Sequence, residues 1–253
     1  MTEPFVSLEG ISQHVATVRL RRPPNNFFSF DMISAIADAL EELDRNDECR
    51  CVVLTAEGKN FCAGADFSGN ASPYSTADLY NAATRLFCTN KPFVAAVNGA
   101  AIGGGLGLAL SADFRIASPE SKFSANFAQL GFHHGFGLTV TLPRLVGEQK
   151  ASELLYTGRR VNGTEAYELG LIDRVVPTSE IESAAFTLAA EIASSAPLAV
   201  ESIRATLRKG IAEKIAQATQ HEMAEQTRLK ATEDFAEGTK AVSQRRPAEF
   251  QRK

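Results

Sequence analysis

Three consecutive glycines, Gly103, Gly104 and Gly105, lie in a stretch that otherwise has the composition of a buried helix, AAIGGGLGLALSADF. A glycine inside a helix costs about 1 kcal/mol relative to alanine, so bare backbone here calls for a reason. The first amides of a helix have no intrahelical partner and can donate to a ligand, which glycine lets approach closely. One such donor typically contributes roughly 3–4 kcal/mol where negative charge develops on a carbonyl oxygen. Close helix–strand packing and phosphate binding are the alternatives.

A second loop, FCAGADF at residues 61–67, also follows a predicted strand and also places small residues where backbone can meet a ligand. Neither loop has GxGxxG spacing or a lysine after its glycines, so both match nucleotide motifs poorly. Two loops that each supply one amide would together hold a single oxyanion.

Proton carriers are scarce beside these loops. His133 and His134 are adjacent in GFHHGFG, and histidine titrates near neutral pH, so either is a candidate general base. Adjacent residues rarely both face one pocket, so a structural pair is the alternative.

The elements that must position these residues alternate between strand and helix in the first half of the chain. After Pro177 nearly every segment has a helical pattern, and no linker separates the two parts. This order predicts an α/β fold with a helical C-terminal part. The expected strands cover residues 14–20, 51–58, 93–99, 113–118, 122–127 and 172–175. The expected helices cover residues 31–44, 76–88, a glycine-led segment ending at 109–112, 139–145, 149–155, 163–169, one behind Pro197, and 213–234.

Composition excludes several function classes. The 253 residues carry a net charge of −4, which argues against a nucleic-acid footprint. No apolar run reaches the ~20 residues that a membrane span needs, and the N-terminus has no signal-peptide pattern. The four cysteines form no CxxC pair and no zinc-like cluster, so we expect reduced thiols, a cytoplasmic location and no metal.

Four segments together resemble the crotonase (enoyl-CoA hydratase/isomerase) superfamily. They are FCAGADF, VNGAAIGGGLGLALSADFRIAS, LPRLVG and TGRRVNGTEAYELGLIDRVV, in the family's order and at its separations, and the resemblance spans residues 5–253. It implies an α/β spiral of ββα units over residues 1–195 and a helical trimerisation region over residues 196–253, giving a homotrimer or a hexamer.

The resemblance also implies an acyl-CoA thioester as the substrate, with coenzyme A entering as part of that substrate rather than as a bound cofactor. The thioester carbonyl would lie between the backbone amides of Ala65 and Gly104. The residues that would lie along coenzyme A are Arg22, Asn26, Phe27, Ala63, Asp66 and Phe67, with Phe250 and Lys253 from the tail. The loop before Asn26 is shorter than is usual in the family, and a helix-capping carboxylate is the alternative for Asp66.

The chain departs from the family where the hydratases carry their two glutamates. By motif position the first is Gly107 and the second is Phe127 here, and a third acidic position of some relatives is Gly135. Tyr80 falls at the helix position where a dehalogenating relative carries its catalytic histidine, although a buried tyrosine more often packs with its hydroxyl satisfied. Asn126 neighbours the second glutamate position and is a candidate to orient water or a carbonyl, with a strand-end turn as its alternative.

General acid–base catalysis is worth about 10²–10⁴-fold, so slow hydration is expected. Two hypotheses follow. The first is an acyl-CoA isomerase, hydrolase, lyase or poor hydratase that uses His133, His134 or Tyr80 as proton carrier. The second is a non-catalytic acyl-CoA carrier or sensor.

Overall fold

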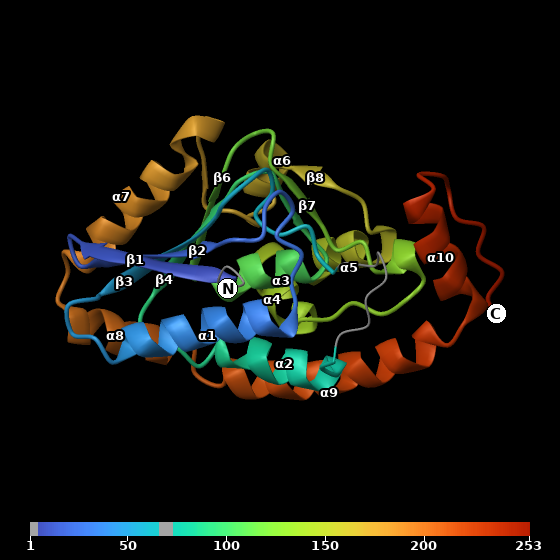
Figure 1. Ribbon diagram of the computed structural model, residues 1–253, viewed down its shortest axis with the longest axis horizontal. Coiled ribbons are helices and arrows are strands. Elements are labelled where there is room, and N and C mark those ends of the chain that lie inside the picture. Colours follow the sequence, from blue (N-terminus) through green and yellow to red (C-terminus); the bar gives the residue numbers. More distant parts are fainter. Residues whose placement is uncertain (1–4, 66–72) are drawn as a thin grey trace.

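A six-stranded sheet forms the centre of the fold in the computed structural model, which describes residues 5–65 and 73–253 (Figure 1). β1 and β2 pair antiparallel, and every later pairing in this sheet is parallel. In spatial order the strands are β1 (Val6–Ser12), β2 (Val15–Leu20), β3 (Cys51–Ala56), β4 (Phe93–Val97), β6 (Phe114–Ala117) and β9 (Arg174–Val175).

Both faces of this sheet are covered, which explains the apolar runs CVVLTA and FVAAV. Alternate strand residues such as Val53 and Val94 pack against α7 (Ile181–Ala193) on one face. Their neighbours, such as Val52 and Ala95, face the main core on the other side, with α1 (Phe30–Asp44). Figure 1 shows α7 and α1 on opposite sides of the strands.

A small second sheet positions the glycine loops. It consists of β5 (Ala100–Ile102), β7 (Lys122–Ser124) and β8 (Val161–Asn162), with β5 parallel to β7. A bridge between Cys62 and Ala101 joins the loop after β3 to β5, and a second bridge joins Phe28 to Ala65. Backbone pairing therefore brings the loops around residues 28, 65 and 103 together.

Helices fill the rest of the chain. α9 packs against α2 and α4, and α10 packs against the short helix η1 (Ala128–Leu130). Figure 1 places α10 at the far end of the molecule from α7. The remaining helices are α2 (Thr76–Arg85), α3 (Gly104–Ser111), α4 (Leu138–Val146), α5 (Glu148–Thr157), α6 (Gly163–Glu168), η2 (Thr178–Glu180), α8 (Pro197–Leu207), α9 (Ile211–Lys230) and α10 (Glu233–Ser243).

The predicted fold class, α/β with a helical C-terminal part, is confirmed. Some element predictions differ from the structure. The strands β1, β5 and β8 were not predicted; most residues of β1 are exposed and show no clean alternation. The helix expected at 213–234 is α9, which ends at Lys230, and Thr232 caps the separate helix α10 by accepting a hydrogen bond from the Phe235 amide. Among the described helices none alone is long and apolar enough to span a membrane, although the bent pair Thr178–Ala193 and Pro197–Leu207 passes on length and composition.

Candidate active site

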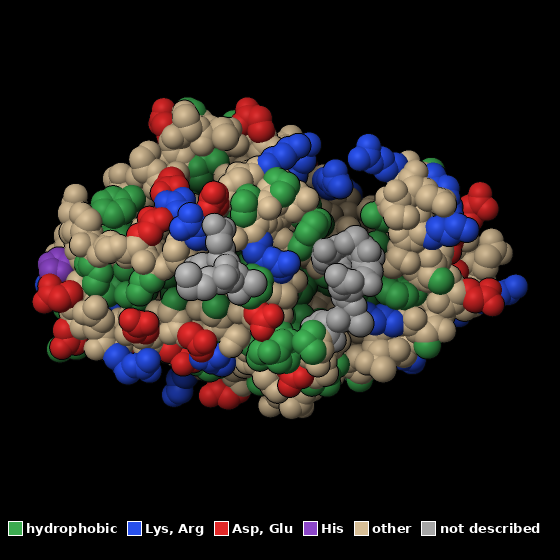
Figure 2. Space-filling model, viewed as in Figure 1, with side chains coloured by type: hydrophobic (Ala, Val, Ile, Leu, Met, Phe, Trp, Pro, Cys, Tyr) green, Lys and Arg blue, Asp and Glu red, His purple; other side chains and the backbone are tan. Residues whose placement is uncertain are grey.

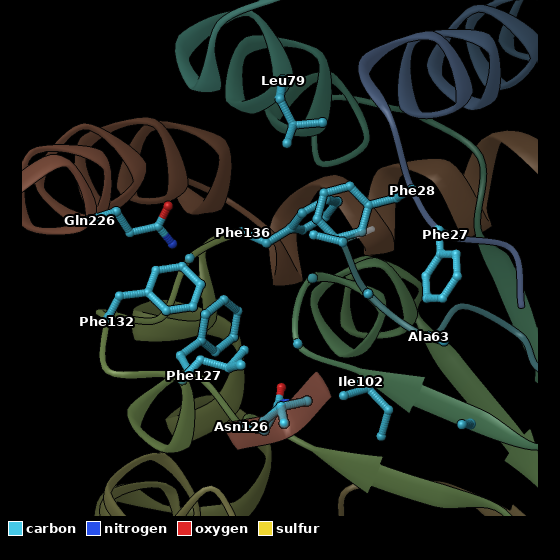
Figure 3. A pocket seen from close by; sticks show the side chains of 18 of the residues that line it. Phe27, Phe28, Ala63, Leu79, Ile102, Asn126, Phe127, Phe132, Phe136 and Gln226 are labelled. Carbon is cyan, nitrogen blue, oxygen red and sulfur yellow. The ribbon is translucent and has the colours of Figure 1, made fainter. Parts of the chain in front are cut away.

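A cavity of about 560 Å³ lies where the three loops meet, between the small sheet, α2 and α9. Its wall is largely aromatic and aliphatic, and Figure 3 shows these side chains converging on one space. No Asp, Glu or His lies among the lining residues that the structure describes. The aromatic lining residues are Phe27, Phe28, Tyr80, Phe127, Phe132 and Phe136.

The two predicted oxyanion amides both lie at this cavity. Ala65 and Gly104 line it, and Gly104 is the first residue of α3, so its amide has no intrahelical partner. Within residues 5–65 and 73–253, neither the Ala65 amide nor the Gly104 amide donates to a protein group. The Gly103 amide is different, because it donates to the Ser124 carbonyl at 2.8 Å. The available donors are thus one from each loop.

The glycines are required by close packing as well as by ligand access. A Cβ atom on Gly104 would lie 2.2 Å from Cε1 of Phe28, and one on Gly105 would lie 2.1 Å from the Cys62 carbonyl oxygen. Gly64 has φ +91°, which side-chain-bearing residues rarely adopt. Helix–strand packing, the alternative considered from the sequence, therefore accounts for Gly105 while leaving the Gly104 amide free.

Phe136 occupies the space beside Gly107. A Cβ atom on Gly107 would lie 2.6 Å from the Phe136 Cβ, and Phe136 itself has φ +63°. Phe136 also packs edge-on against Phe28, with 6.0 Å between ring centroids. The position that the resemblance gives to the first hydratase glutamate thus has no room for a side chain.

Gly135 leaves room for two polar side chains. A Cβ atom there would lie 1.8 Å from the Tyr80 hydroxyl oxygen and 2.6 Å from Nε2 of Gln226. Tyr80 and Gln226 both line the cavity and both are buried. Burial, reinforced by the negative charge of Glu222, raises the pKa of Tyr80. Tyr80 is therefore protonated at neutral pH and is a hydrogen-bond donor rather than a base.

His133 and His134 do not line the cavity. Their rings stack at 4.1 Å between centroids, and the His133 Nδ1 lies 2.8 Å from the His134 carbonyl oxygen. His134 Nε2 lies 2.9 Å from the Thr139 hydroxyl, which donates to Glu222 at 2.6 Å and must therefore accept from the histidine. Burial, with the neighbouring His133 and His221, lowers the pKa of His134 to about 4. Nε2 of His134 lies 3.9 Å from a carboxylate oxygen of Glu222, and the Thr139 hydroxyl bridges the two side chains. Burial, rather than this negative charge, therefore determines the direction in which the pKa of His134 shifts.

The buried Glu222 holds this loop in place. Its carboxylate accepts hydrogen bonds from the Gly137 amide at 2.9 Å and the Thr139 amide at 3.1 Å, at the start of α4. A carboxylate at a helix N-terminus satisfies the unpaired amides and complements the helix dipole. Glu222 is fully buried yet fully partnered, which gives it a structural task outside the cavity.

Only some of the residues expected along coenzyme A line the cavity. Phe27 and Ala63 line the cavity, whereas Arg22 donates to the Phe27 carbonyl and lies over the Phe5 ring. Asn26 is fully buried, and its side-chain amide donates to the carbonyls of Glu57 and Asn60. These hydrogen bonds tie its loop to the loop after β3. Asp66 and Phe67 lie outside the described residues.

The C-terminal tail folds back onto α10. Asp234 accepts hydrogen bonds from the amides of Gln251 and Arg252, and its own amide donates to the Lys253 carbonyl. Phe250 is exposed, and neither it nor Lys253 lines the cavity.

The cavity also holds a group of cations that were not predicted from the sequence. Lys59, Lys122, Arg160 and Lys230 line it, and within the described part of the chain none forms an ion pair. Figure 2 shows Lys and Arg side chains around the hollow beside α10. These residues come from four separate segments, so no sequence motif announces them.

Comparison with known proteins identifies the family. Residues 10–253 match the family described as enoyl-CoA hydratase/isomerase. The crotonyl-CoA hydratase of Syntrophomonas wolfei is 35% identical over 246 residues, covering 94% of this chain and 95% of that protein. The short-chain-enoyl-CoA hydratase of Clostridium acetobutylicum is 36% identical over 206 residues, covering 78% of each.

Solved structures show the same fold. An enoyl-CoA hydratase/isomerase from Pseudoalteromonas atlantica superimposes with a TM-score of 0.88 at 28% identity, covering 98% of this chain and all of the other. An enoyl-CoA hydratase from Bacillus anthracis gives a TM-score of 0.77 at 31% identity, covering 98% of this chain and all of the other. The fold is thus the crotonase fold, as the resemblance implied, and the chain belongs to the enoyl-CoA hydratase/isomerase family of acyl-CoA enzymes.

Proposed function

We propose that this enzyme binds an acyl-CoA thioester with its carbonyl oxygen between the amides of Ala65 and Gly104. The observation that carries the proposal is a pair of amides that donate to no group among the described residues and that two loops supply to one cavity. Two donors in a largely apolar space stabilise an enolate or a tetrahedral oxyanion without needing a side chain.

The charges around the cavity support the same substrate. Coenzyme A carries phosphates, and four cations that form no ion pair with any described residue offer them partners on a chain of net charge −4: Lys59, Lys122, Arg160 and Lys230. The aromatic wall then suits the acyl group. The predicted contacts of Phe27 and Ala63 fit this path, and those of Arg22, Asn26, Phe250 and Lys253 remain predictions.

We further propose that the enzyme is a poor enoyl-CoA hydratase. Gly107 is packed against Phe136, Phe127 is apolar, and no carboxylate lines the described cavity. Tyr80 remains as a proton donor at the cavity. The side chains of His133 and His134 do not line the cavity. Their loop neighbours Phe132, Gly135 and Phe136 do so. A non-catalytic acyl-CoA carrier or sensor is the second candidate, and the apolar lining favours it.

Exposed apolar residues on α8 support the predicted homotrimer or hexamer. Leu198, Ile203 and Leu207 are 80%, 60% and 69% exposed on one short helix, which is unusual for a surface that stays in water. Ile203→Glu should shift the protein toward monomer in light scattering after size exclusion. An unchanged mass would place the interface elsewhere. The division at residue 195 and the cytoplasmic location remain predictions.

A panel of acyl-CoA esters tests the function. We expect saturable binding by calorimetry and crotonyl-CoA hydration about 10²–10⁴-fold slower than that of the S. wolfei enzyme assayed beside it. Product formation from another ester, lost in Tyr80→Phe, would establish an enzyme. Binding without any product would favour the carrier. Hydration at the rate of the control enzyme would refute the proposal, as would failure to bind any ester.

A further inference from the structure

Tyr80 and Gln226 form a polar pair in an otherwise apolar part of the cavity wall. They come from α2 and α9 and meet at Gly135, where a side chain would displace them. Their neighbours in the wall are Leu79, Leu130 and Phe132. A buried polar pair in such surroundings is costly unless its hydrogen bonds are satisfied, so its bonds can be accounted for one by one.

The Gln226 amide group already donates its hydrogen bonds to protein oxygens. Gln226 Nε2 donates to the His133 carbonyl at 3.0 Å, and it and the Phe136 amide also hydrogen-bond with the Tyr80 oxygen. The Tyr80 oxygen therefore accepts from two protein donors, and its own proton must be directed elsewhere. No acceptor for that proton is found among residues 5–65 and 73–253.

Gln226 adds an acceptor beside this donor. Its Oε1 makes no hydrogen bond within the described residues. It is also not one of the described side-chain atoms that are fully buried without a partner, so part of its surface is accessible. The pair thus offers one O–H donor and one carbonyl acceptor at the cavity. A hydroxyl group, which donates and accepts at once, complements both.

Charges of both signs lie near the pair. The carboxylate of Glu222 acts electrostatically on Tyr80, and it is occupied by the amides at the start of α4. Lys230, four residues from Gln226 on α9, also lines the cavity. The negative charge disfavours an anion hydrogen-bonded to Tyr80 itself, whereas it does not oppose a neutral oxygen there.

The position of the pair indicates which part of the substrate it meets. In Figure 3, Gln226 lies at the opposite end of the cavity from Phe27 and Ala63, with Phe136 between. Under the proposed function coenzyme A runs past Phe27 and Ala63, and the carbonyl lies at Ala65 and Gly104. The chain beyond the carbonyl then points toward Gln226.

We propose that the acyl group carries a neutral hydroxyl at its distal end, which accepts from the Tyr80 hydroxyl and donates to Gln226 Oε1. This inference rests on the proposed function, and it names the substrate class of the same site. Tyr80 acts in it as a specificity-determining residue that holds the acyl chain.

Calorimetry with matched ligands tests the inference. Butyryl-, hexanoyl- and octanoyl-CoA are each compared with their ω-hydroxy and ω-carboxyl derivatives, so that chain length is scanned. At the chain length that reaches the pair, we expect the ω-hydroxy ester to bind about three- to tenfold more tightly than the unsubstituted ester. In Tyr80→Phe this ratio falls to about one. Tyr156→Phe, an equally conservative change on an exposed tyrosine, should keep the wild-type ratio.

The outcomes distinguish a failure of the distal-hydroxyl inference from a failure of the proposed acyl-CoA binding. Equal affinity for hydroxylated and plain esters at every length, a ratio unchanged in Tyr80→Phe, or tightest binding of the ω-carboxyl ester would overturn the inference and leave the proposed function intact. No binding of any ester would overturn both. If Tyr80→Phe melts far below the wild type, Gln226→Met replaces it and should lower the same ratio.

Discussion

Gly107→Ala tests whether Phe136 fills the space beside Gly107. The new methyl group would lie 2.6 Å from Phe136 Cβ and 2.7 Å from its Cδ1, which no relaxed structure tolerates. Overpacking of this kind costs typically about 1–3 kcal/mol, and such a short contact to a Cβ atom belongs at the upper end. Alanine's helix propensity returns about 1 kcal/mol, so the net loss should be about 2 kcal/mol.

A double-mutant cycle with Phe136→Gly isolates this contact. The three atoms nearest to the new Cβ all belong to the Phe136 side chain, so its removal leaves alanine only its helix-propensity gain of about 1 kcal/mol. The effect of Gly107→Ala should therefore change sign, with a coupling of about 3 kcal/mol. Unfolding free energies from urea titration, read at constant m, measure it.

Gly10→Ala serves as the matched control, because a Cβ there meets nothing within 4 Å. Without a clash, it should leave the protein as stable as the wild type or more stable by up to about 1 kcal/mol, because Gly10 lies in β1. A Gly107→Ala protein as stable as the wild type, or additive effects in the cycle, would refute the packing argument.

Three other predictions follow from the site. Because burial holds the pKa of His134 at about 4 against its ordinary 6.5, the unfolded chain takes up the proton first as pH falls, and stability is lost through this window. The loss at pH 5 should be about 2 kcal/mol, and His134→Gln should abolish it in urea titrations at several pH values; an undiminished loss would contradict the assignment. Lys59→Ala and Lys122→Ala should each weaken acyl-CoA binding about two- to fivefold and flatten its salt dependence, whereas Lys150→Ala, on an exposed lysine paired with Glu153, should do neither. Gly107→Glu alone should not accelerate crotonyl-CoA hydration, whereas adding Phe136→Gly and Phe127→Glu should, by up to about 10²-fold; a gain in the single variant would show that the glycine is not sterically blocked.

Much of this fold was predictable because its signals are local. Ser29 caps α1 by accepting from the Met32 amide, and the apolar positions Met32, Ile36 and Leu40 are all buried as their spacing predicts. The glycine loops were predictable for a similar reason, since backbone donors need particular residue types at particular points of a strand–loop–helix unit. The placement of Ala65 and Gly104 at one cavity agrees with that expectation.

The composition of the cavity could not be predicted, because it depends on contacts between distant segments. Gln226 lies on α9, and only the packing of α9 against α2 brings it to Tyr80. Phe136 reaches Gly107 through a left-handed backbone conformation that a phenylalanine rarely adopts. His133 and His134 have residue types suited to catalysis, but their loop is held away from this role. The buried carboxylate of Glu222, on α9, accepts hydrogen bonds from the Gly137 and Thr139 amides just after the two histidines.

The account depends most on the hydrogen bonds from the Ala65 and Gly104 amides to the thioester carbonyl. Isotope-edited infrared difference spectroscopy of a carbonyl-labelled acyl-CoA measures them, with the free ester as reference. Two amide donors should polarise the bond and move its stretching band to a lower wavenumber in the saturated complex. A band at or above the wavenumber of the free ester, with binding confirmed on the same sample, would contradict the account.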